Sequence, residues 1–226
     1  MKHPNLCAAF FAATVLLMSP GANAQVNGPM GNATMDMTAE THYKSWPKIK
    51  EADITRKRRV WEDINVKAQM SPTSVFYAYN SKMPLADVLI KGVTAGKIKA
   101  YSNENDRFTR ELTKDEFATA YGQTTAKNTE IVKYLVKEDS LYVNTGEITV
   151  RILGIAPVAA IKAADGTITE QTLFWIFYPD TREYLASVPV NGADGWYDIF
   201  EKRNYSGSIT RLSEGKWADN KSANKQ

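Results

Sequence analysis

The chain offers few of the side chains that catalyse reactions. Its two histidines are His3 and His42, and its one cysteine is Cys7. A nucleophilic serine or threonine needs a base within hydrogen-bond reach, and His42 stands in a polar stretch that gives it no fixed neighbours. The sequence also contains no Gly-x-Ser-x-Gly segment. We therefore expect no catalytic residues and do not expect an enzyme.

Metal and cofactor motifs are absent from the sequence as well. It has no His-Glu-x-x-His, no cysteine pair and no twelve-residue calcium loop. The segment Asn103-Glu104-Asn105-Asp106 could offer oxygen ligands to calcium, but it lacks the closing glutamate, so we interpret it as a polar turn. Adjacent acids such as Glu62-Asp63 point apart, whereas glycoside hydrolysis needs two facing carboxylates. The sequence predicts no metal site and no cofactor.

A basic run followed by a tryptophan is the clearest candidate for contact with a partner. It comprises Arg56, Lys57, Arg58, Arg59 and Trp61. At the start of a helix, four cations oppose the helix dipole. A partner would explain them, because arginine stacks on aromatic rings and is favoured at interfaces. A solvated face remains the alternative for the cations, and a place in the domain's own core remains the alternative for Trp61.

The first 24 residues have the layout of a secretory signal peptide. Lys2 precedes an apolar run from Cys7 to Met18, and Ala22-Asn23-Ala24 is a cleavage site. Cys7 begins the apolar run, so we expect no lipid anchor. We expect an exported chain without disulfides that relies on its core. Loss of Lys2 lowers the formal charge from +3 to +2, which does not favour a nucleic-acid partner.

The rest of the chain divides into three parts. Residues 25–52 are rich in Asn, Gly, Thr and Met without periodicity, which predicts a flexible arm. Residues 53–212 form the expected single α+β domain, and residues 213–226 form a polar tail.

Helical and mixed signals fill the first half of the domain. The spacing of Val60, Trp61 and Ile64 predicts a helix over 54–69. The following elements are a strand over 75–79, a helix that opens at Pro84 and closes at Gly96, an alternating strand over 97–101, and a short helix that begins with the capping box Thr113 and Glu116.

From residue 131 the apolar period changes to two, which predicts three consecutive strands over 131–143, 148–160 and 168–178. Asn144-Thr145-Gly146 and Asp165-Gly166 are typical hairpin turns. A last helix is expected from Gly195 to Arg203. The predicted fold is therefore α+β, with an antiparallel sheet that forms a three-strand meander in the C-terminal half and packs with several short helices.

Taken in order, five segments resemble the GldN/PorN family of the Bacteroidetes type IX secretion and gliding machinery. The resemblance extends from about Asp53 to Leu212, and its most specific parts are Arg-Ile-Leu-Gly-Ile-Ala-Pro and Phe-Trp-Ile-Phe-Tyr-Pro-Asp. The segments are Arg58–Ile64, Pro84–Leu89 with Gly96–Tyr101, Val150–Pro157, Leu173–Arg182 and Asp198–Arg203.

The resemblance implies a non-catalytic periplasmic component of this machinery, peripheral to the outer membrane. It implies a GldK/PorK-like lipoprotein as partner, a large ring at the inner face of the outer membrane, and contact with the GldM/PorM-like periplasmic motor protein. A closed ring needs two different patches on each subunit, joined head to tail. The alternative is a periplasmic protein that binds a ligand, a glycan or peptidoglycan through exposed aromatic rings.

Overall fold

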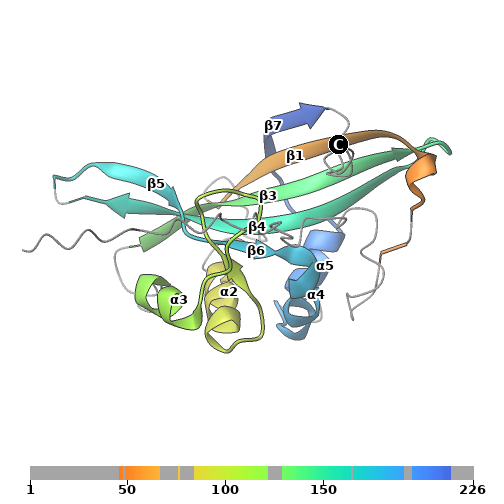
Figure 1. Ribbon diagram of the computed structural model, residues 1–226. Helices are drawn as coiled ribbons and strands as arrows, with labels where there is room; N and C mark the ends of the chain where they lie inside the picture. The colour runs from red at the N-terminus through yellow and green to blue at the C-terminus, as the bar shows by residue number, and fades with distance from the viewer. Residues whose placement is uncertain are drawn as a thin grey trace, which may run out of the picture.

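The computed structural model is built on a strongly elongated antiparallel sheet with helices on one side (Figure 1). It describes residues 46–47, 49–66, 76, 84–121, 129–163, 165–190 and 195–214. The predicted α+β class and antiparallel sheet are confirmed. The strands are β1 (Ile54–Asn65), β2 (Ala100–Tyr101), β3 (Thr129–Val143), β4 (Ile148–Lys162), β5 (Ile168–Thr172), β6 (Trp175–Phe177) and β7 (Ser208–Glu214).

The sheet has the order β2-β6-β4-β3-β1-β7, and β5 also pairs with β4. Short α-helices lie below the sheet in Figure 1. They are α2 (Leu85–Thr94), α3 (Lys114–Tyr121), α4 (Tyr178–Ser187) and α5 (Trp196–Glu201). The 3₁₀ helix η1 (Glu51–Asp53) directly precedes β1 at the end of the sheet.

The core lies between the sheet and these helices. Side chains of α2 such as Val88 and Leu89 are buried together with Val136 of β3 and Phe200 of α5. At this boundary the Tyr134 hydroxyl accepts a hydrogen bond of 3.0 Å from the backbone N–H of Ala86. The apolar stripe of α2 therefore fixes this helix against the sheet.

The predicted helix over 54–69 is wrong, because residues 54–65 form strand β1. The spacing of four between Val60 and Ile64 fits a strand as well as a helix, since four is a multiple of two. β1 lies between β3 and β7, so both of its edges are hydrogen bonded. This pairing with distant segments decides the structure, and local periodicity could not reveal it.

The two long strands of the second half were predicted almost to the residue. β3 and β4 form a hairpin whose turn contains Gly146 at φ +87°, and Gly166 has the same φ in the next turn. The predicted third strand over 168–178 is instead divided into β5 and β6, which both pair with β4. Helix α4 then begins at Tyr178, with Pro179 in its first turn, where the missing N–H costs nothing.

The capping box before α3 is confirmed. The Thr113 hydroxyl accepts from the backbone N–H of Glu116 at 3.2 Å, and the Glu116 carboxylate accepts from the backbone N–H of Thr113 at 2.8 Å. Of the strand predicted over 97–101, only residues 100–101 form β2. The last predicted helix is observed as α5, with Gly195 as its N-cap.

Several predictions fall wholly or largely outside the described residues. They are the signal peptide (1–24), most of the arm (25–52), most of the strand over 75–79 and most of the tail (213–226). The short helix η1, helix α4 and strand β7 were not predicted.

Candidate interaction surface

The basic run does not form one patch, because a strand sends alternate side chains to opposite faces of the sheet. Arg56 and Arg58 lie over the ring of Tyr142, with guanidinium-to-centroid distances of 5.4 and 6.0 Å. Arg56 is exposed, whereas Arg58 is half-buried. These two arginines and Tyr142 therefore form a basic and aromatic surface near the β3–β4 turn.

The other two cations of the run point toward Asp139 of β3. Arg59 donates from Nε to Oδ1 at 2.6 Å and from Nη2 to Oδ2 at 2.9 Å. The Nζ of Lys57 lies 3.7 Å from Oδ2. Arg59 is 5% exposed and Asp139 is fully buried. Arg59 is consequently part of the interior of this domain, and we remove it from the candidate partner site.

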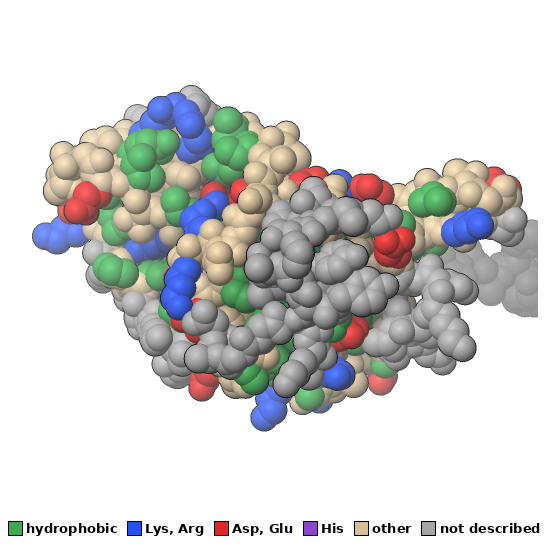
Figure 2. All heavy atoms as spheres, turned by 180° about the vertical axis from the view of Figure 1, so that it is seen from behind, with side chains coloured by type: hydrophobic (Ala, Val, Ile, Leu, Met, Phe, Trp, Pro, Cys, Tyr) green, Lys and Arg blue, Asp and Glu red, His purple; other side chains and the backbone are tan. Residues whose placement is uncertain are grey.

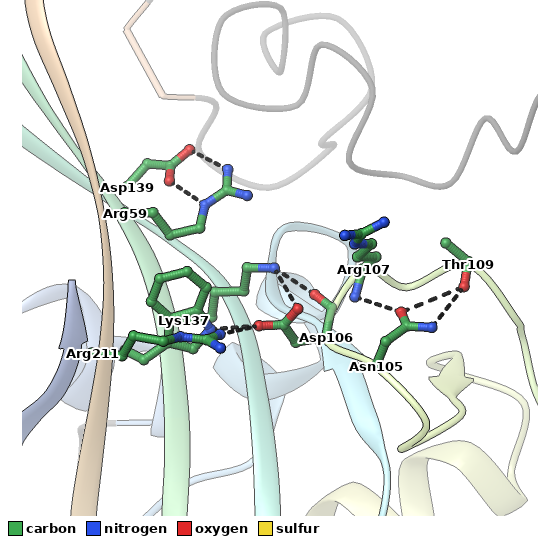
Figure 3. Close-up of polar contacts among 9 residues, drawn as sticks. Arg59, Asn105, Asp106, Arg107, Thr109, Lys137, Asp139 and Arg211 are labelled. Carbon is green, nitrogen blue, oxygen red and sulfur yellow. Dashed lines mark hydrogen bonds and ion pairs between the residues drawn. The ribbon is translucent and has the colours of Figure 1, made fainter. Parts of the chain in front are cut away.

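Trp61 belongs to a polar cluster centred on Asp106, which we call the Asp106 cluster. Its members are Trp61 of β1, Lys137 of β3, Arg211 of β7 and Asp106, from the loop between β2 and α3. The Trp61 indole donates to Oδ2 of Asp106 at 2.5 Å, and Arg211 donates to the same oxygen at 2.8 Å. Lys137 donates to the Asp106 carbonyl at 2.5 Å and lies 3.4 Å from Oδ1 (Figure 3).

The rings reinforce this arrangement. The guanidinium of Arg211 stacks on the ring of Trp61 at 3.5 Å, and the Nζ of Lys137 lies 5.6 Å from the same ring. Trp61, Lys137 and Arg211 stand in one row across three strands, so their side chains share a face. Trp61 is half-buried there. Trp61 therefore contacts residues of its own domain, as the alternative to a partner contact predicted.

The charges of the cluster shift one another's ionisation. Burial lowers the pKa of Lys137 to about 8, although the Asp106 carboxylate opposes this shift. Burial would raise the pKa of Asp106, but the cations of Lys137 and Arg211 and the Trp61 N–H together hold it below its usual value. The carboxylate of Asp106 therefore stays ionised beside Lys137 and Arg211.

The segment predicted to be a polar turn supplies Asp106, and the same loop places Phe108 in the core. Asn105 accepts from the backbone N–H of Arg107 at 2.9 Å, which tightens the loop. Phe108 is 1% exposed and has a φ of +56°. Its ring lies against Gly154, where an added Cβ would stand 2.4 Å from the Phe108 Cζ. Because residue 154 is a glycine, the Phe108 ring can lie directly against β4 and hold the loop there.

A second cluster ties the start of the described chain to the helices, and we call it the Trp46 clamp. The Trp46 ring lies close to two arginines, with guanidinium-to-centroid distances of 5.4 Å for Arg151 of β4 and 4.7 Å for Arg182 of α4. Both arginines are 1% exposed. Arg182 lies 3.3 Å from a carboxylate oxygen of Glu201, and Arg151 donates to the carbonyl of Pro47 at 2.5 Å.

The sequence carried no local signal for the clamp, since Trp46 is more than a hundred residues away from Arg151, Arg182 and Glu201. The Trp46 indole faces Glu201 at 3.5 Å, and the Tyr178 hydroxyl donates to the same carboxylate at 2.9 Å. Burial lowers the pKa of Arg151, and the neighbouring charge of Arg182 adds to that effect. The ring of Trp46 attracts both guanidinium groups, and this attraction offsets part of the cost of burying two cations together.

A third polar group connects the sheet to the segment before β7. Arg203 donates to Glu138 at 2.6 Å and to Glu62 at 3.0 Å. Burial raises the pKa of Glu62 against the opposing effect of Arg203, and the nearby Glu138 raises it further. The guanidinium of Arg203 also lies 5.5 Å from the ring centre of Tyr205. The buried acids of β1 and β3 are therefore neutralised from within the chain.

In these clusters, charged residues of the interior form ion pairs and hydrogen bonds with other residues of the same chain. Within the described ranges, no three His, Cys, Asp or Glu side chains gather closely enough to hold a metal ion. Among the helices that the structure describes, none is long and apolar enough to cross a membrane. An open hollow near α3 is lined by residues such as Arg110 and Tyr121.

The fold and these contacts define an α+β domain whose polar side chains serve packing and contact. The family model of the gliding motility associated protein GldN matches residues 49–224, which is well over half of the chain. The chain belongs to the GldN family, as the five segments indicated. This family is associated with gliding motility and is not a known enzyme family. No curated protein matches the chain.

Proposed function

We propose that this chain is a non-catalytic structural component of the type IX secretion and gliding motility machinery. In this proposal it works in the periplasm, where it binds a GldK/PorK-like lipoprotein and forms a ring with it at the inner face of the outer membrane. The ring meets the GldM/PorM-like motor protein. The observation that carries the proposal is the match to the GldN family over residues 49–224.

The contact with the lipoprotein is assigned to the surface made by Arg56, Arg58 and Tyr142. Arg56 is exposed and pairs in register with Tyr142, over whose ring its guanidinium lies. Cations over an aromatic ring are typical of protein interfaces. Arg59 and Trp61 are not part of this site, because the interior clusters already use them.

The test is a pull-down of the tagged exported chain from a detergent extract of its own cells. We expect a lipoprotein near stoichiometry in a very large complex, identified by mass spectrometry. Arg56→Glu should reduce the recovered lipoprotein at least several-fold, while Lys97→Glu, an exposed cation in the loop after α2, should leave it unchanged. A chain recovered alone as a monomer would contradict the proposal.

The second candidate, a glycan- or ligand-binding protein, needs a row of exposed aromatic rings. The described tryptophans do not offer one: Trp46, Trp175 and Trp196 are buried, and Trp61 is covered by Arg211. We therefore favour the assembly component. Binding of soluble peptidoglycan fragments by the purified chain would reopen the alternative.

A further inference from the structure

We propose that copies of this chain join head to tail by strand pairing, with β7 of one copy lying against the first half of β4 of the next. These two edges are the subunit surfaces that would form the proposed ring. The pairing of the edges rests on the proposed function only in that the assembly closes into a ring. The sheet edges themselves carry the argument.

The first surface is the outer edge of β7. This strand ends the sheet order, and the described residues contain no strand on its far side (Figure 1). Its side chains Ile209 and Leu212 are 62% and 47% exposed. An edge strand with exposed aliphatic side chains is a template for another strand. β7 carries one bulge opposite Trp61 and Glu62 and the charged Arg211, and its aliphatic side chains stay exposed on either side of them.

The second surface is the start of β4. Residues 148–152 pair with β3, while β6 and β5 take the other side of β4 only from Gly154 and Val158 onward. Ile148 and Val150 are 57% and 37% exposed. Arg151 and Ile152 are 1% and 5% exposed, and Arg151 is held in the Trp46 clamp, so the accessible part of this second edge is residues 148–150, on the opposite side of the sheet from β7.

The register places these exposed side chains on one face. Leu212 stands in a row with Val60, Glu138 and Ile152 across β7, β1, β3 and β4, and residues paired in this way share a face. Ile148 and Val150 lie on that face because they are four and two residues from Ile152. Ile209 pairs with Glu62, two residues from Val60, and shares the face as well.

Exposed large aliphatic side chains are rare elsewhere on the described surface. The exposed large aliphatic residues are Ile148, Val150, Ile168, Ile209 and Leu212, and four of these five belong to the two edges. Figure 2 shows apolar side chains among basic ones toward the end of the molecule that carries the β3–β4 turn. Joining the edges would bring the four aliphatic side chains into one stripe and remove them from water.

The strand directions suit a repeat by translation. Every neighbouring pair from β4 through β3 and β1 to β7 is antiparallel, so β7 runs opposite to β4. A second copy placed beside the first without being turned over would set its β4 antiparallel to the first copy's β7. Because the two edges differ, the contact repeats, and a small rotation at each step closes a ring.

The competing arrangement is β7 against β7 about a twofold axis. It would produce a closed dimer and would leave Ile148 and Val150 exposed, so the observed edges favour the head-to-tail contact. The two arrangements make different predictions for variants that block one edge each.

The experiment measures self-association of the purified exported chain by sedimentation velocity over a concentration series. One variant carries Ile209→Lys and Leu212→Lys, and the other carries Ile148→Lys and Val150→Lys. All four positions are exposed, so the fold should persist, as circular dichroism will check. Each variant should lose association by roughly tenfold or more, from the lost apolar contact and the added charges.

An equimolar mixture of the two variants is the decisive sample. Each variant keeps one intact edge, so head-to-tail pairing predicts 1:1 dimers that cannot extend. Ile168→Lys, on β5 and outside both edges, is the matched control and should associate like the wild type.

Four results would overturn the inference: a monomeric wild type, a monomeric mixture, a β4-edge variant that associates normally, or an equal loss on changing Ile168. Because the lipoprotein is absent from this assay, any of these could occur while the pull-down still recovers the lipoprotein. Failure of the edge pairing is therefore distinguishable from failure of the proposed function.

Discussion

Arg59 shows how one residue changes meaning once its surroundings are known. In the sequence it is one of four adjacent cations, whereas in the fold its guanidinium makes two hydrogen bonds to the fully buried Asp139. The side chain of a strand residue can point to either face, so neighbouring Arg58 and Arg59 have unrelated roles. A charge run on a strand therefore cannot be treated as a single site.

We expect Arg59→Met to lower the free energy of unfolding by about 3–5 kcal/mol, because it leaves the Asp139 carboxylate buried without its bidentate partner. Urea denaturation followed by circular dichroism measures this loss. The control, Arg56→Met, alters an exposed side chain and should change stability by about 0.5 kcal/mol or less. Equal effects of both substitutions would contradict a buried ion pair.

Lys137 makes stability depend on pH in an unusual direction. Its pKa is lowered to about 8 in the folded state from 10.5, so between these values the unfolded chain binds more protons and stability rises with pH. From pH 7 to 9.5 this residue should add about 2 kcal/mol to the free energy of unfolding. The range stops below 10, where tyrosines of the unfolded chain ionise.

The measurement compares the pH dependence of urea unfolding between the wild type and Lys137→Met. The variant should lack the increase, because it has no group at this position to release a proton. An identical slope for both proteins would show that the ammonium is not held in the interior as the Asp106 cluster requires.

At the scale of elements, close approach between a loop and a strand decides how the sheet is covered. The Phe108 ring occupies the space where residue 154 would carry a Cβ, and it also meets the rings of Tyr101 and Phe177 edge to face. Only a glycine on β4 permits this contact. The position of the loop that holds Asp106 therefore depends on Gly154, which in the sequence is only a small residue within an apolar strand.

Gly154→Ala should lower the free energy of unfolding by about 1–3 kcal/mol through this steric conflict. Combining it with Phe108→Ala should cost less than the two single losses together, because the smaller side chain removes the conflict. Thermal or urea unfolding of the four proteins of this cycle provides the test. Additive losses would mean that the two residues do not compete for the same space.

Element prediction succeeded where signals were local and failed where pairing was distant. Gly146 and Gly166 adopt the positive φ of their turns, and Thr113 with Glu116 forms the capping box, since neighbours determine these conformations. Strand β1 was mistaken for a helix because its apolar spacing fits both periods. Its pairing with β3, some eighty residues away, settled the choice.

For the whole molecule, the Trp46 clamp joins the segment before the first strand to the sheet and to α4 and α5. Trp46→Ala should lower the free energy of unfolding by about 3–5 kcal/mol, because it empties a buried site and removes the ring that both Arg151 and Arg182 contact. Lys50→Ala, an exposed change close by in the chain, serves as the control. A variant as stable as this control would mean that the clamp does not hold the segment.

The sequence by itself determined the class of fold, the two hairpin turns, the capped helix and the relationship to GldN, because these depend on local patterns and on the order of characteristic segments. Only the tertiary structure decided that residues 54–65 form a central strand, that Arg59 lies inside, and that Trp46 meets two arginines from β4 and α4. The physical reason is the same in each case. Burial and strand pairing join residues far apart in the chain, and their free energy outweighs local preference.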